Sequence, residues 1–414
     1  MVPYHRTEIK KIQTPGNHRL PAVEGGTPVR PLPLPFSPPS IGEREIREVV
    51  RVLRSGWITR GEKCEQFERL LCTYTGGRHC VVLSSATAGL FLTLKVHGIG
   101  PGDEVVTTPY TFAATATAVL HAGARPVFAD IVEDGFHLDP GAFRSKITSR
   151  TRAVIPVHFG GEPAPLQEIR EIAGSRGILV IEDAAHALGA SCRGERIGGG
   201  PNPAVFSFHA VKNVTTAEGG AVTTGDARTA ELLRLYSLHG QTRDARQKLL
   251  RGGWRYDITV PGYKLNMTDL QAALGVAQLQ RIEHIQGRRE EIARRYGEAL
   301  GDLDILRLPV PPPGTISARH LYPLRVDFSR LRVDRDAFIQ ALWAENVPSN
   351  VHYIPVHLMS YYREAFGYKP LDFPRAYRTF LSEMSLPLYP DMSDRDADDV
   401  AAAVRKLVDH YRTG

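Results

Sequence analysis

The sequence predicts an α/β fold: a large domain with a mostly parallel mixed sheet sandwiched by helices, plus a smaller C-terminal α+β domain. From about residue 79 to 225, short apolar runs alternate with helical patterns, which is typical of a parallel sheet covered on both faces. A proline-rich segment at 306–314 then marks a change of domain. With 414 residues, 42% of them hydrophobic, the chain can form one large core and a smaller companion.

The first elements follow from composition and helix capping. Residues 1–38 are rich in Pro and Gly and lack periodicity, which predicts an extended arm. Ser40 and Glu43 have the spacing of a capping box, in which the serine accepts from a first-turn amide and the glutamate reaches back. The helix that follows ends at Gly56. Its apolar residues share one face and are Ile46, Val49, Val50 and Leu53.

The sheet is predicted from apolar runs of strand length. They are 80–83, 104–107, 126–129, 153–157, 179–182, 204–208 and 221–224. Segments between several of these runs have helical periodicity, namely 87–97, 112–121 and 165–175. No internal repeat accompanies the alternation, so a single layered α/β domain is expected.

A long amphipathic helix is predicted at about 267–300, where it links the two domains. Its apolar side carries Leu270, Leu274, Ala277, Ile282 and Ile285. Beyond it, the patterns at 320–328, 334–345 and 394–411 indicate an α+β unit. We therefore expect a large domain at 39–285 and a small domain at 286–414.

The charge balance suits an anionic partner. The formal net charge is +6, which would fit nucleic acid or a small phosphorylated ligand. The densest basic run, 281–295, alternates with glutamates at helical spacing and therefore indicates a solvated helix face. Since no nucleic-acid-binding motif accompanies it, we expect no nucleic-acid partner.

Apolar stretches and cysteines indicate a cytoplasmic protein. The N-terminus has no apolar signal core, and the longest apolar stretches, 86–96 and 112–124, are too short and Thr-rich to span a membrane. The four cysteines form no CxxC pair and have no histidine close enough in sequence for a zinc knuckle. We expect free thiols in a reducing compartment and no metal site.

Two motifs place an acid and a lysine after predicted strands. The strand at 179–182 leads into Asp183 and His186, and the carboxyl ends of strands in open α/β sheets face the ligand crevice. Lys212 follows a short aromatic strand and precedes a pair of glycines. Each motif has an ordinary structural alternative: Asp183 as the cap of the next helix, and Lys212 as a surface lysine in a loop.

A third motif places small hydroxyl residues where a strand turns into a helix. In Ser84-Ser85-Ala86-Thr87-Ala88-Gly89 the free amides of a helix N-terminus would make a phosphate site, or the hydroxyl groups could simply cap the helix.

Together these motifs match the needs of pyridoxal 5'-phosphate (PLP). PLP requires a lysine that bonds its carbonyl carbon, an acid against its pyridine nitrogen and donors around its phosphate. It also needs an apolar face against the ring, which Tyr110-Thr111-Phe112 can supply. No GxGxxG follows an early strand, which argues against a Rossmann dehydrogenase.

The sequence resembles the DegT/StrS family of sugar aminotransferases over nearly the whole chain. The motifs EDAAHALGA, FSFHAVKN and GYKLNMTDLQAA carry the resemblance. It implies the fold-type-I architecture of PLP transferases. One departure is Ala217, which stands where the family often has glycine before Glu-Gly-Gly, a change for which we expect little consequence.

The resemblance implies roles for the residues around the cofactor ring. Lys212 would bond the cofactor and carry protons, and Asp183 would pair with the pyridine nitrogen. His186 would lie near the phenolic oxygen, and Phe112 would stack on the ring.

The phosphate residues implied by the resemblance come from two subunits. Ala86, Thr87 and Ser207 would hold the phosphate within one chain. Asn266 resembles the residue that reaches the phosphate from the neighbouring subunit, which implies a homodimer with a shared active site.

The substrate side is also implied by position in the family. Trp57 and Thr59 lie in a segment, SGWIT, that resembles the substrate-side loop. His352, Tyr353 and His357 resemble a small-domain segment that lines the sugar pocket, although the two histidines fit structural roles equally well. Their i,i+5 spacing does not suit a helical metal pair.

The resemblance implies transfer of an amino group from an amino acid, L-glutamate, to a nucleotide-linked 4-keto-6-deoxyhexose. The combination SGWIT, LHG and GYKLNMTDLQAA is closest to enzymes that aminate C4 of the sugar. Alternatives are a C3 ketosugar or cyclitol aminotransferase of the same family, or a non-catalytic PLP-fold regulator. Lys212 argues against the dehydratase branch, in which histidine replaces it.

Overall fold

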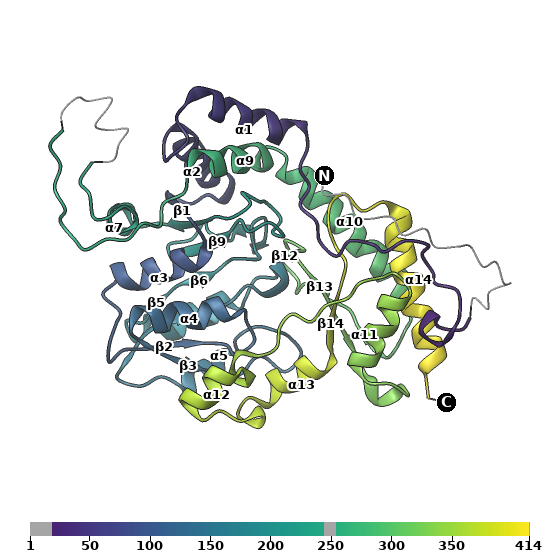
Figure 1. Ribbon diagram of the computed structural model, residues 1–414. Coiled ribbons are helices and arrows are strands. Elements are labelled where there is room, and N and C mark those ends of the chain that lie inside the picture. Colours follow the sequence, from purple (N-terminus) through teal and green to yellow (C-terminus); the bar gives the residue numbers. More distant parts are fainter. Residues whose placement is uncertain (1–18, 244–253, 414) are drawn as a thin grey trace.

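The computed structural model describes residues 19–243 and 254–413, which form the expected α/β architecture (Figure 1). The main sheet consists of two four-stranded parts, β3-β2-β4-β5 and β1-β10-β9-β6, which meet where a parallel bridge joins Val157 to Asp183. Adjacent strands are parallel except at β10, which is antiparallel to both β9 and β1. The mostly parallel mixed sheet is thus confirmed. Its strands are β1 His79–Leu83, β2 Glu104–Thr107, β3 Arg125–Phe128, β4 Thr151–Ile155, β5 Leu179–Val180, β6 Glu182–Asp183, β9 Ala204–Ser207 and β10 Gly220–Thr224.

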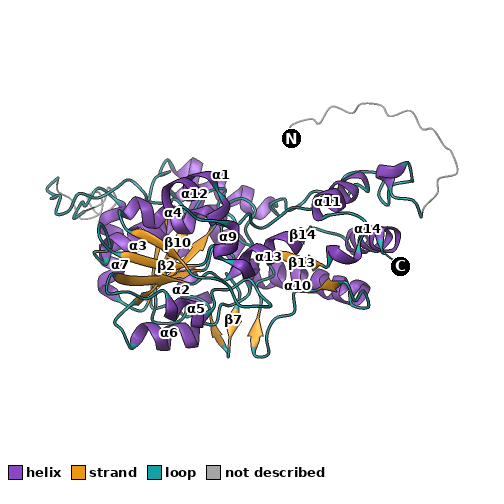
Figure 2. Cartoon of the chain, turned by 90° about the horizontal axis from the view of Figure 1, so that it is seen from below, coloured by secondary structure: helices purple, strands orange, loops and turns teal. Residues whose placement is uncertain are grey.

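Helices cover both faces of this sheet (Figure 2). Leu90 and Val222 belong to a buried cluster on the face that carries α3, α4 and α7. Phe67 and Phe206 belong to a cluster on the opposite face, which carries α2, α6 and α9, and α5 covers the same face through Phe143. Within residues 19–243 and 254–413, no helix combines the length and apolarity needed to cross a membrane. The helices are α1 Glu43–Ser55, α2 Glu62–Thr75, α3 Ala86–Val96, α4 Ala113–Ala122, α5 Pro140–Ser145, α6 Leu166–Gly174, α7 Ala227–Ser237 and α9 Asp269–Leu279.

The C-terminal part has its own sheet and its own buried cluster. The strand order is β11-β13-β14, and α10, α11 and α14 pack against these strands. A smaller three-stranded sheet, β12-β7-β8, joins the two parts of the chain. The bounds are β7 Ser191–Cys192, β8 Glu195–Arg196, α10 Ile282–Leu300, β11 Leu306–Arg307, β12 Thr315–Ile316, β13 Tyr322–Val326, α11 Arg335–Ala344, α12 Ser360–Phe366, α13 Pro374–Ser382, β14 Glu383–Leu386 and α14 Asp394–Tyr411.

The prediction of one long helix at 267–300 is wrong. The chain forms α9 and α10 with a break at Gln280 and Arg281, and Thr268 caps the start of α9. Side chains at the break bond to another segment: Gln278 donates to the Ser40 carbonyl, and Arg281 lies 3.6 Å from Glu45. We attribute the break to these tertiary contacts, which periodicity along the chain does not register.

The predicted capping box at Ser40 and Glu43 is wrong by two residues. α1 begins at Glu43 after the N-cap Gly42, whose amide donates to the Glu45 carboxylate at 2.9 Å. The Ser40 hydroxyl instead donates to Asp391 at 2.8 Å, so a distant partner occupies the group that was expected to cap the helix.

The N-terminal arm lies along the C-terminal part of the molecule (Figure 1). Between residues 19 and 38 the helical content is one 3₁₀ turn, Ala22–Glu24, while residues 1–18 of the predicted arm lie outside the described residues. The buried Glu345 carboxylate accepts from the Ala22 and Val29 amides at 2.8 Å each. Arg30 pairs with Asp396 and Asp399, and Leu34 enters the C-terminal core.

Candidate active site

A cavity of 470 Å³ opens at the carboxyl ends of the parallel strands. Residues that follow or end β1, β2, β4, β6 and β9 all line it: Ser85, Thr111, Val157, Asp183 and Ser207. The remaining walls come from the N-terminal arm, the loop between β9 and β10, and the segments around residues 320 and 352. The sheet therefore gathers polar groups that are more than a hundred residues apart in the chain.

Asp183 is a buried carboxylate held by two hydrogen bonds. Its side chain accepts from the Thr115 hydroxyl at 2.7 Å and from the Ala185 amide at 3.2 Å. Thr115 is itself 2.8 Å from the Thr111 hydroxyl, so the carboxylate has a fixed orientation. Burial raises the pKa of Asp183, while these bonds and the charge of Lys212 oppose the rise. A cationic group in the cavity would favour its ionised form.

Lys212 places its amine in the same cavity. It lies in the loop between β9 and β10, where its backbone amide donates to the His209 carbonyl at 2.9 Å. Its Nζ lies 3.4 Å from Nε2 of His320. Burial lowers the pKa of Lys212 to about 8, although Asp183 opposes the shift. A lysine with this pKa has a much larger neutral, nucleophilic fraction at pH 7 than an exposed lysine.

The start of α3 presents backbone donors to the cavity. The Ser85 hydroxyl accepts from the Ala88 amide and the Ser85 carbonyl accepts from the Gly89 amide, which leaves the amides of Ala86 and Thr87 for a ligand. Strand β10 passes so close that a Cβ on Gly220 would lie 2.4 Å from the Ala86 nitrogen. This site combines free amides with the positive end of a helix, which suits a phosphate.

Aromatic side chains line the space between these groups. Phe112 is 59% exposed although it is large and apolar, so a flat ligand could cover it. His186 accepts from the Gly160 amide through Nδ1 at 3.2 Å, which places its proton on Nε2. That Nε2 lies 3.2 Å from the Tyr353 hydroxyl, so a neutral His186 can donate to an oxygen in the cavity. Burial and the charge of Lys212 keep the pKa of His186 far below its usual value.

The cavity brings together most of the residues predicted from the sequence. Those that line it are Ala86, Thr87, Phe112, Asp183, His186, Ser207, Lys212, His352 and Tyr353. Their individual roles stay predictions, but the geometry places an amine, a carboxylate, helix amides and aromatic faces in one space.

Four predicted residues do not line this cavity. The Trp57 indole donates to the Arg60 carbonyl, and the Thr59 carbonyl accepts from the Asp269 amide at the start of α9. Asn266 pairs with Leu83 in a β-bridge, and its side chain bonds Lys264 and the Met267 carbonyl. His357 is fully buried, with Nε2 3.3 Å from the Pro370 carbonyl. Within one chain these residues support the surrounding structure, and their predicted substrate and cofactor roles stay predictions.

Sequence reasoning missed several residues at the site. Thr115 lies inside α4, one turn after the recognised Phe112, and reaches Asp183 only because α4 packs over the strand ends. His320 comes from the segment before β13, and Phe36 from the arm, where its ring stacks on His352 at 5.7 Å. In the sequence, His320 and Phe36 are isolated polar and aromatic residues within short segments, HLY and FSP, that match no motif.

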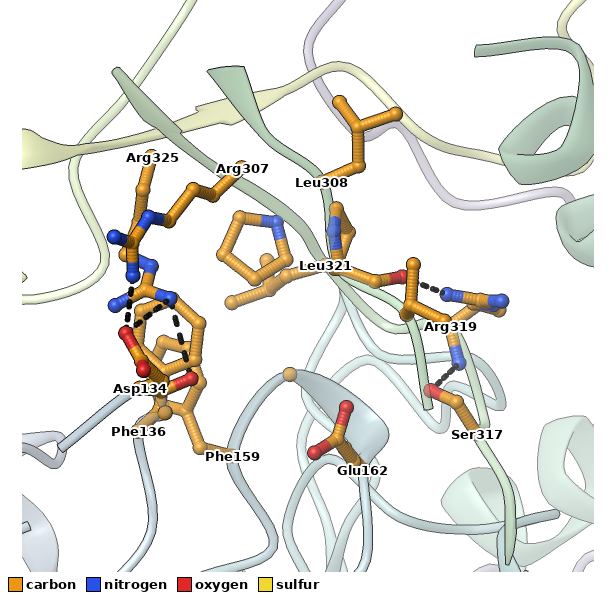
Figure 3. A pocket seen from close by; sticks show the side chains of 15 residues that line it. Asp134, Phe136, Phe159, Glu162, Arg307, Leu308, Ser317, Arg319, Leu321 and Arg325 are labelled. Carbon is orange, nitrogen blue, oxygen red and sulfur yellow. Dashed lines mark hydrogen bonds and ion pairs between the residues drawn. The ribbon is translucent and has the colours of Figure 1, made fainter. Parts of the chain in front are cut away.

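A smaller cleft of 80 Å³ lies beside the cavity and shares Phe159 and Leu321 with it (Figure 3). Its arginines are paired with carboxylates: Arg307 and Arg325 with Asp134, and Arg319 with Glu290. Burial raises the pKa of Glu162, which also lines this cleft, to about 7. Because its cationic groups already have partners, we assign the chemistry to the larger cavity.

Comparison with known proteins identifies the family. The sequence pattern of the DegT/DnrJ/EryC1/StrS aminotransferase family matches residues 39–405. The chain belongs to this family. The spore coat polysaccharide biosynthesis protein SpsC of Bacillus subtilis (strain 168) is 47% identical over 377 residues, which make up 91% of this chain and 97% of SpsC.

Solved structures agree with the assignment to the DegT/DnrJ/EryC1/StrS family. The putative sugar aminotransferase Spr1654 from Streptococcus pneumoniae, in its PMP-form, matches with a TM-score of 0.86 and 37% identity over 91% of this chain and 99% of Spr1654. Spr1654 has also been solved in a PLP-form. DesI, solved in the presence of its TDP-sugar product, matches with a TM-score of 0.83 and 32% identity over 93% of this chain and 95% of DesI. The protein is a PLP-dependent sugar aminotransferase, and the predicted family, fold type and cofactor are confirmed.

The residues in the cavity fit PLP. Phe112 offers an uncovered apolar face, and α3 offers the amides of Ala86 and Thr87. Asp183 is a buried carboxylate that lacks a cationic hydrogen-bond partner in the described chain, which is the environment that a protonated pyridine nitrogen would complete. Lys212 supplies an amine with a lowered pKa in the same space.

Proposed function

We propose that this protein transfers an amino group from L-glutamate to C4 of a nucleotide-linked 4-keto-6-deoxyhexose. The observation that carries the proposal is that one large cavity contains both the amine of Lys212, whose pKa is lowered, and the buried carboxylate of Asp183. The similarity to DesI, which was solved with its TDP-sugar product, supports a nucleotide-linked substrate. The relation to SpsC, a polysaccharide biosynthesis protein, supports a sugar destined for a glycan.

The residues of the chain divide the work of amino transfer. Bound PLP would supply an electron-accepting ring that stabilises negative charge at the carbon next to the transferred nitrogen. Asp183 would hold the proton on the ring nitrogen, and His186 would donate from Nε2 to the ring oxygen. The free Lys212 amine would remove the proton from the α-carbon of glutamate and later deliver one to C4 of the sugar.

The cavity also has room for a sugar beyond the PLP-binding groups. The N-terminal arm contributes Phe36 and Ser37 to its wall, and the segment after α11 contributes Asn350 and His352. Phe36 is stacked against His352, so arm and C-terminal part together form an amphipathic wall suited to a hexose ring. The net charge of +6 favours the approach of a nucleotide diphosphate.

Incubation of the PLP-loaded enzyme with glutamate, followed by a panel of nucleotide-linked 3-keto and 4-keto sugars, tests this function. We expect glutamate to bleach the visible absorbance of the bound cofactor, and a 4-keto-6-deoxyhexose to restore it with formation of the 4-aminosugar. Restoration by a 3-keto sugar alone would overturn the C4 assignment. An absence of bleaching by any amino acid would indicate a non-catalytic regulator.

The same proposal includes a homodimer with a shared active site and no nucleic-acid partner. Large apolar side chains are exposed on α1 and in the segment before α9, and contact with a second chain would remove them from water. They include Ile46 at 47%, Leu53 at 55% and Trp254 at 79% exposure. Asn266 is bridged to the last residue of β1, beside the start of α3 but outside the cavity of its own chain. From that position it is proposed to reach the phosphate held by the partner.

A heterodimer of two inactive variants tests the shared site. If Asn266 acts across the interface, a purified heterodimer of Lys212→Ala and Asn266→Asp chains has one site with both lesions and one intact site, and should regain about half of the wild-type activity. The control is a heterodimer of Lys212→Ala with wild type, which should show the same activity. If the heterodimer of Lys212→Ala and Asn266→Asp chains were inactive, Asn266 would act in the active site of its own chain.

We also propose a boundary between the two domains and a cytoplasmic location. We place the boundary near residue 285 because Ile282 packs in a cluster of the large sheet, whereas Ile292 packs with β13 and β14. A cytoplasmic location is supported by the four free cysteines, Cys64, Cys72, Cys80 and Cys192, which suit a reducing compartment.

A further inference from the structure

We propose that His320 is a positioning residue for Lys212, whose amine it holds through the lone pair on Nε2. The inference rests on the proposed role of Lys212 and adds the group that orients it. His320 is 4% exposed, and its Nε2 lies 3.4 Å from Nζ of Lys212. Nε2 of His320 can accept from Lys212 only if the ring proton is on Nδ1, and the surrounding hydrogen bonds determine which nitrogen carries it.

Two backbone carbonyls determine the orientation of the neighbouring amides. Gln286 donates through Nε2 to the Ser317 carbonyl at 2.9 Å, so its Oε1 is free to accept. Asn213 donates through Nδ2 to the Ala318 carbonyl at 2.5 Å and toward Gln286 Oε1 at 3.5 Å. Since carbonyl oxygens only accept, neither amide can be turned over without placing two acceptors against each other. The Asn213 oxygen therefore faces His320.

The Asn213 oxygen in turn determines the tautomer of His320. It lies 3.2 Å from Nδ1 of His320, and an amide oxygen requires a donor. Nδ1 therefore carries the proton, and Nε2 presents its lone pair to Lys212. This is the less common tautomer of a free histidine side chain, and here the protein environment selects it.

The groups that face the ring keep His320 neutral. Burial comes first, followed by the positive charges of Lys212 and Arg289 and the nearby rings of His186 and His352, and all of them lower the pKa of His320. Arg289 is itself 2% exposed and donates to the His320 carbonyl. His320 is therefore a hydrogen-bond acceptor at neutral pH rather than a base that competes with Lys212 for the transferred proton.

Holding the amine of Lys212 matters for catalysis because it determines where the nitrogen lone pair points. A lysine at the end of four rotatable bonds can point its lone pair in many directions, and only one of them faces the carbon that loses its proton. An acceptor that holds one N–H bond restricts the rotation of the amine and directs its lone pair to the cavity. The same bond stabilises the ammonium form more than the amine, so it raises the pKa of Lys212 against the effect of burial.

The test measures the titration of Lys212 in the full-length enzyme loaded with pyridoxamine phosphate, in which the lysine is free. Carbamylation by cyanate follows the neutral amine, and mass spectrometry of the Lys212 peptide gives the pH midpoint. We expect the midpoint of His320→Phe to fall by about one unit relative to wild type. His320→Gln, whose side-chain oxygen can replace Nε2 as acceptor, should keep the wild-type midpoint.

The control variant is His137→Gln, which alters another buried histidine, one that lies 3.0 Å from the Glu162 carbonyl and outside the cavity. Its midpoint should equal that of wild type. Equal midpoints for wild type and His320→Phe, or equal shifts in the Phe and Gln variants, would overturn the proposal.

A second measurement does not depend on variants. Nitrogen-15 NMR of the wild type loaded with pyridoxamine phosphate should show His320 protonated at Nδ1 and unprotonated at Nε2, and the opposite tautomer would overturn the proposal. Neither measurement requires turnover of a sugar. Failure of every nucleotide sugar to react would therefore affect the proposed function and leave these two results unchanged.

Discussion

Replacing Lys212 with alanine is expected to lower amino transfer by at least about 10⁴-fold, because one side chain both bonds the cofactor and moves the proton. The Lys212 amine lies in the cavity rather than in a packed core, so the variant should fold with an unchanged melting temperature. Borohydride reduction of the PLP-loaded protein should attach the cofactor to the peptide that contains residue 212 in wild type only.

The control for this variant is Lys146→Ala, at an exposed position that follows α5. It should keep wild-type activity and covalent trapping of the cofactor. Full activity of Lys212→Ala would refute the assigned role.

The rate in wild type should fall as the pH drops below about 8, since the pKa of Lys212 is lowered to that value and only the neutral amine accepts a proton.

Asp183→Asn is expected to lower amino transfer by about 100-fold or more. Loss of a charge-assisted hydrogen bond to the ring nitrogen removes about 1.5–3 kcal/mol, and the neutral amide cannot keep that nitrogen protonated. Single-turnover reaction with glutamate, followed by the absorbance of the cofactor, measures the effect without any sugar. An unchanged single-turnover rate would contradict the pairing of Asp183 with the ring.

Thr115→Val provides a graded test of the same site. Valine fills the space of threonine but removes the 2.7 Å bond to Asp183, so we expect a loss of about 10-fold with a further rise in the pKa of that carboxyl. Thr93→Val is the matched control, because Thr93 is equally buried but donates to the Gly89 carbonyl in α3. Equal effects of the two variants would mean that only stability had changed.

Local sequence patterns predicted the main sheet well because its strands are short, apolar and bounded by turns. The run at 104–107 coincides with β2, and α14 begins and ends where the pattern at 394–411 does. Capping was less predictable: Ser40 has the right spacing to start a helix, yet its hydroxyl bonds Asp391, which is 351 residues away. A pattern along the chain contains no information about such a partner.

One departure from the family pattern has a conformational meaning that the sequence did not show. Ala217 has a φ of +65°, in the left-handed region that favours glycine, so the alanine carries a cost of about 1–2 kcal/mol. The expectation of little consequence is therefore wrong for the backbone, because this conformation is one that glycine adopts without that cost.

The chemical identity of the site was determined by the sequence. Lys212, Asp183 and the small residues before α3 each follow or end a strand, and strand ends in a parallel sheet meet at one edge, so their order along the chain sufficed to infer PLP. The tertiary structure alone decided how these groups are held. Thr115, Asn213 and His320 act through hydrogen bonds between segments that are 68 to 108 residues apart. Such bonds depend on the packing of whole elements, and neither motif nor periodicity specifies which side chains that packing brings into contact.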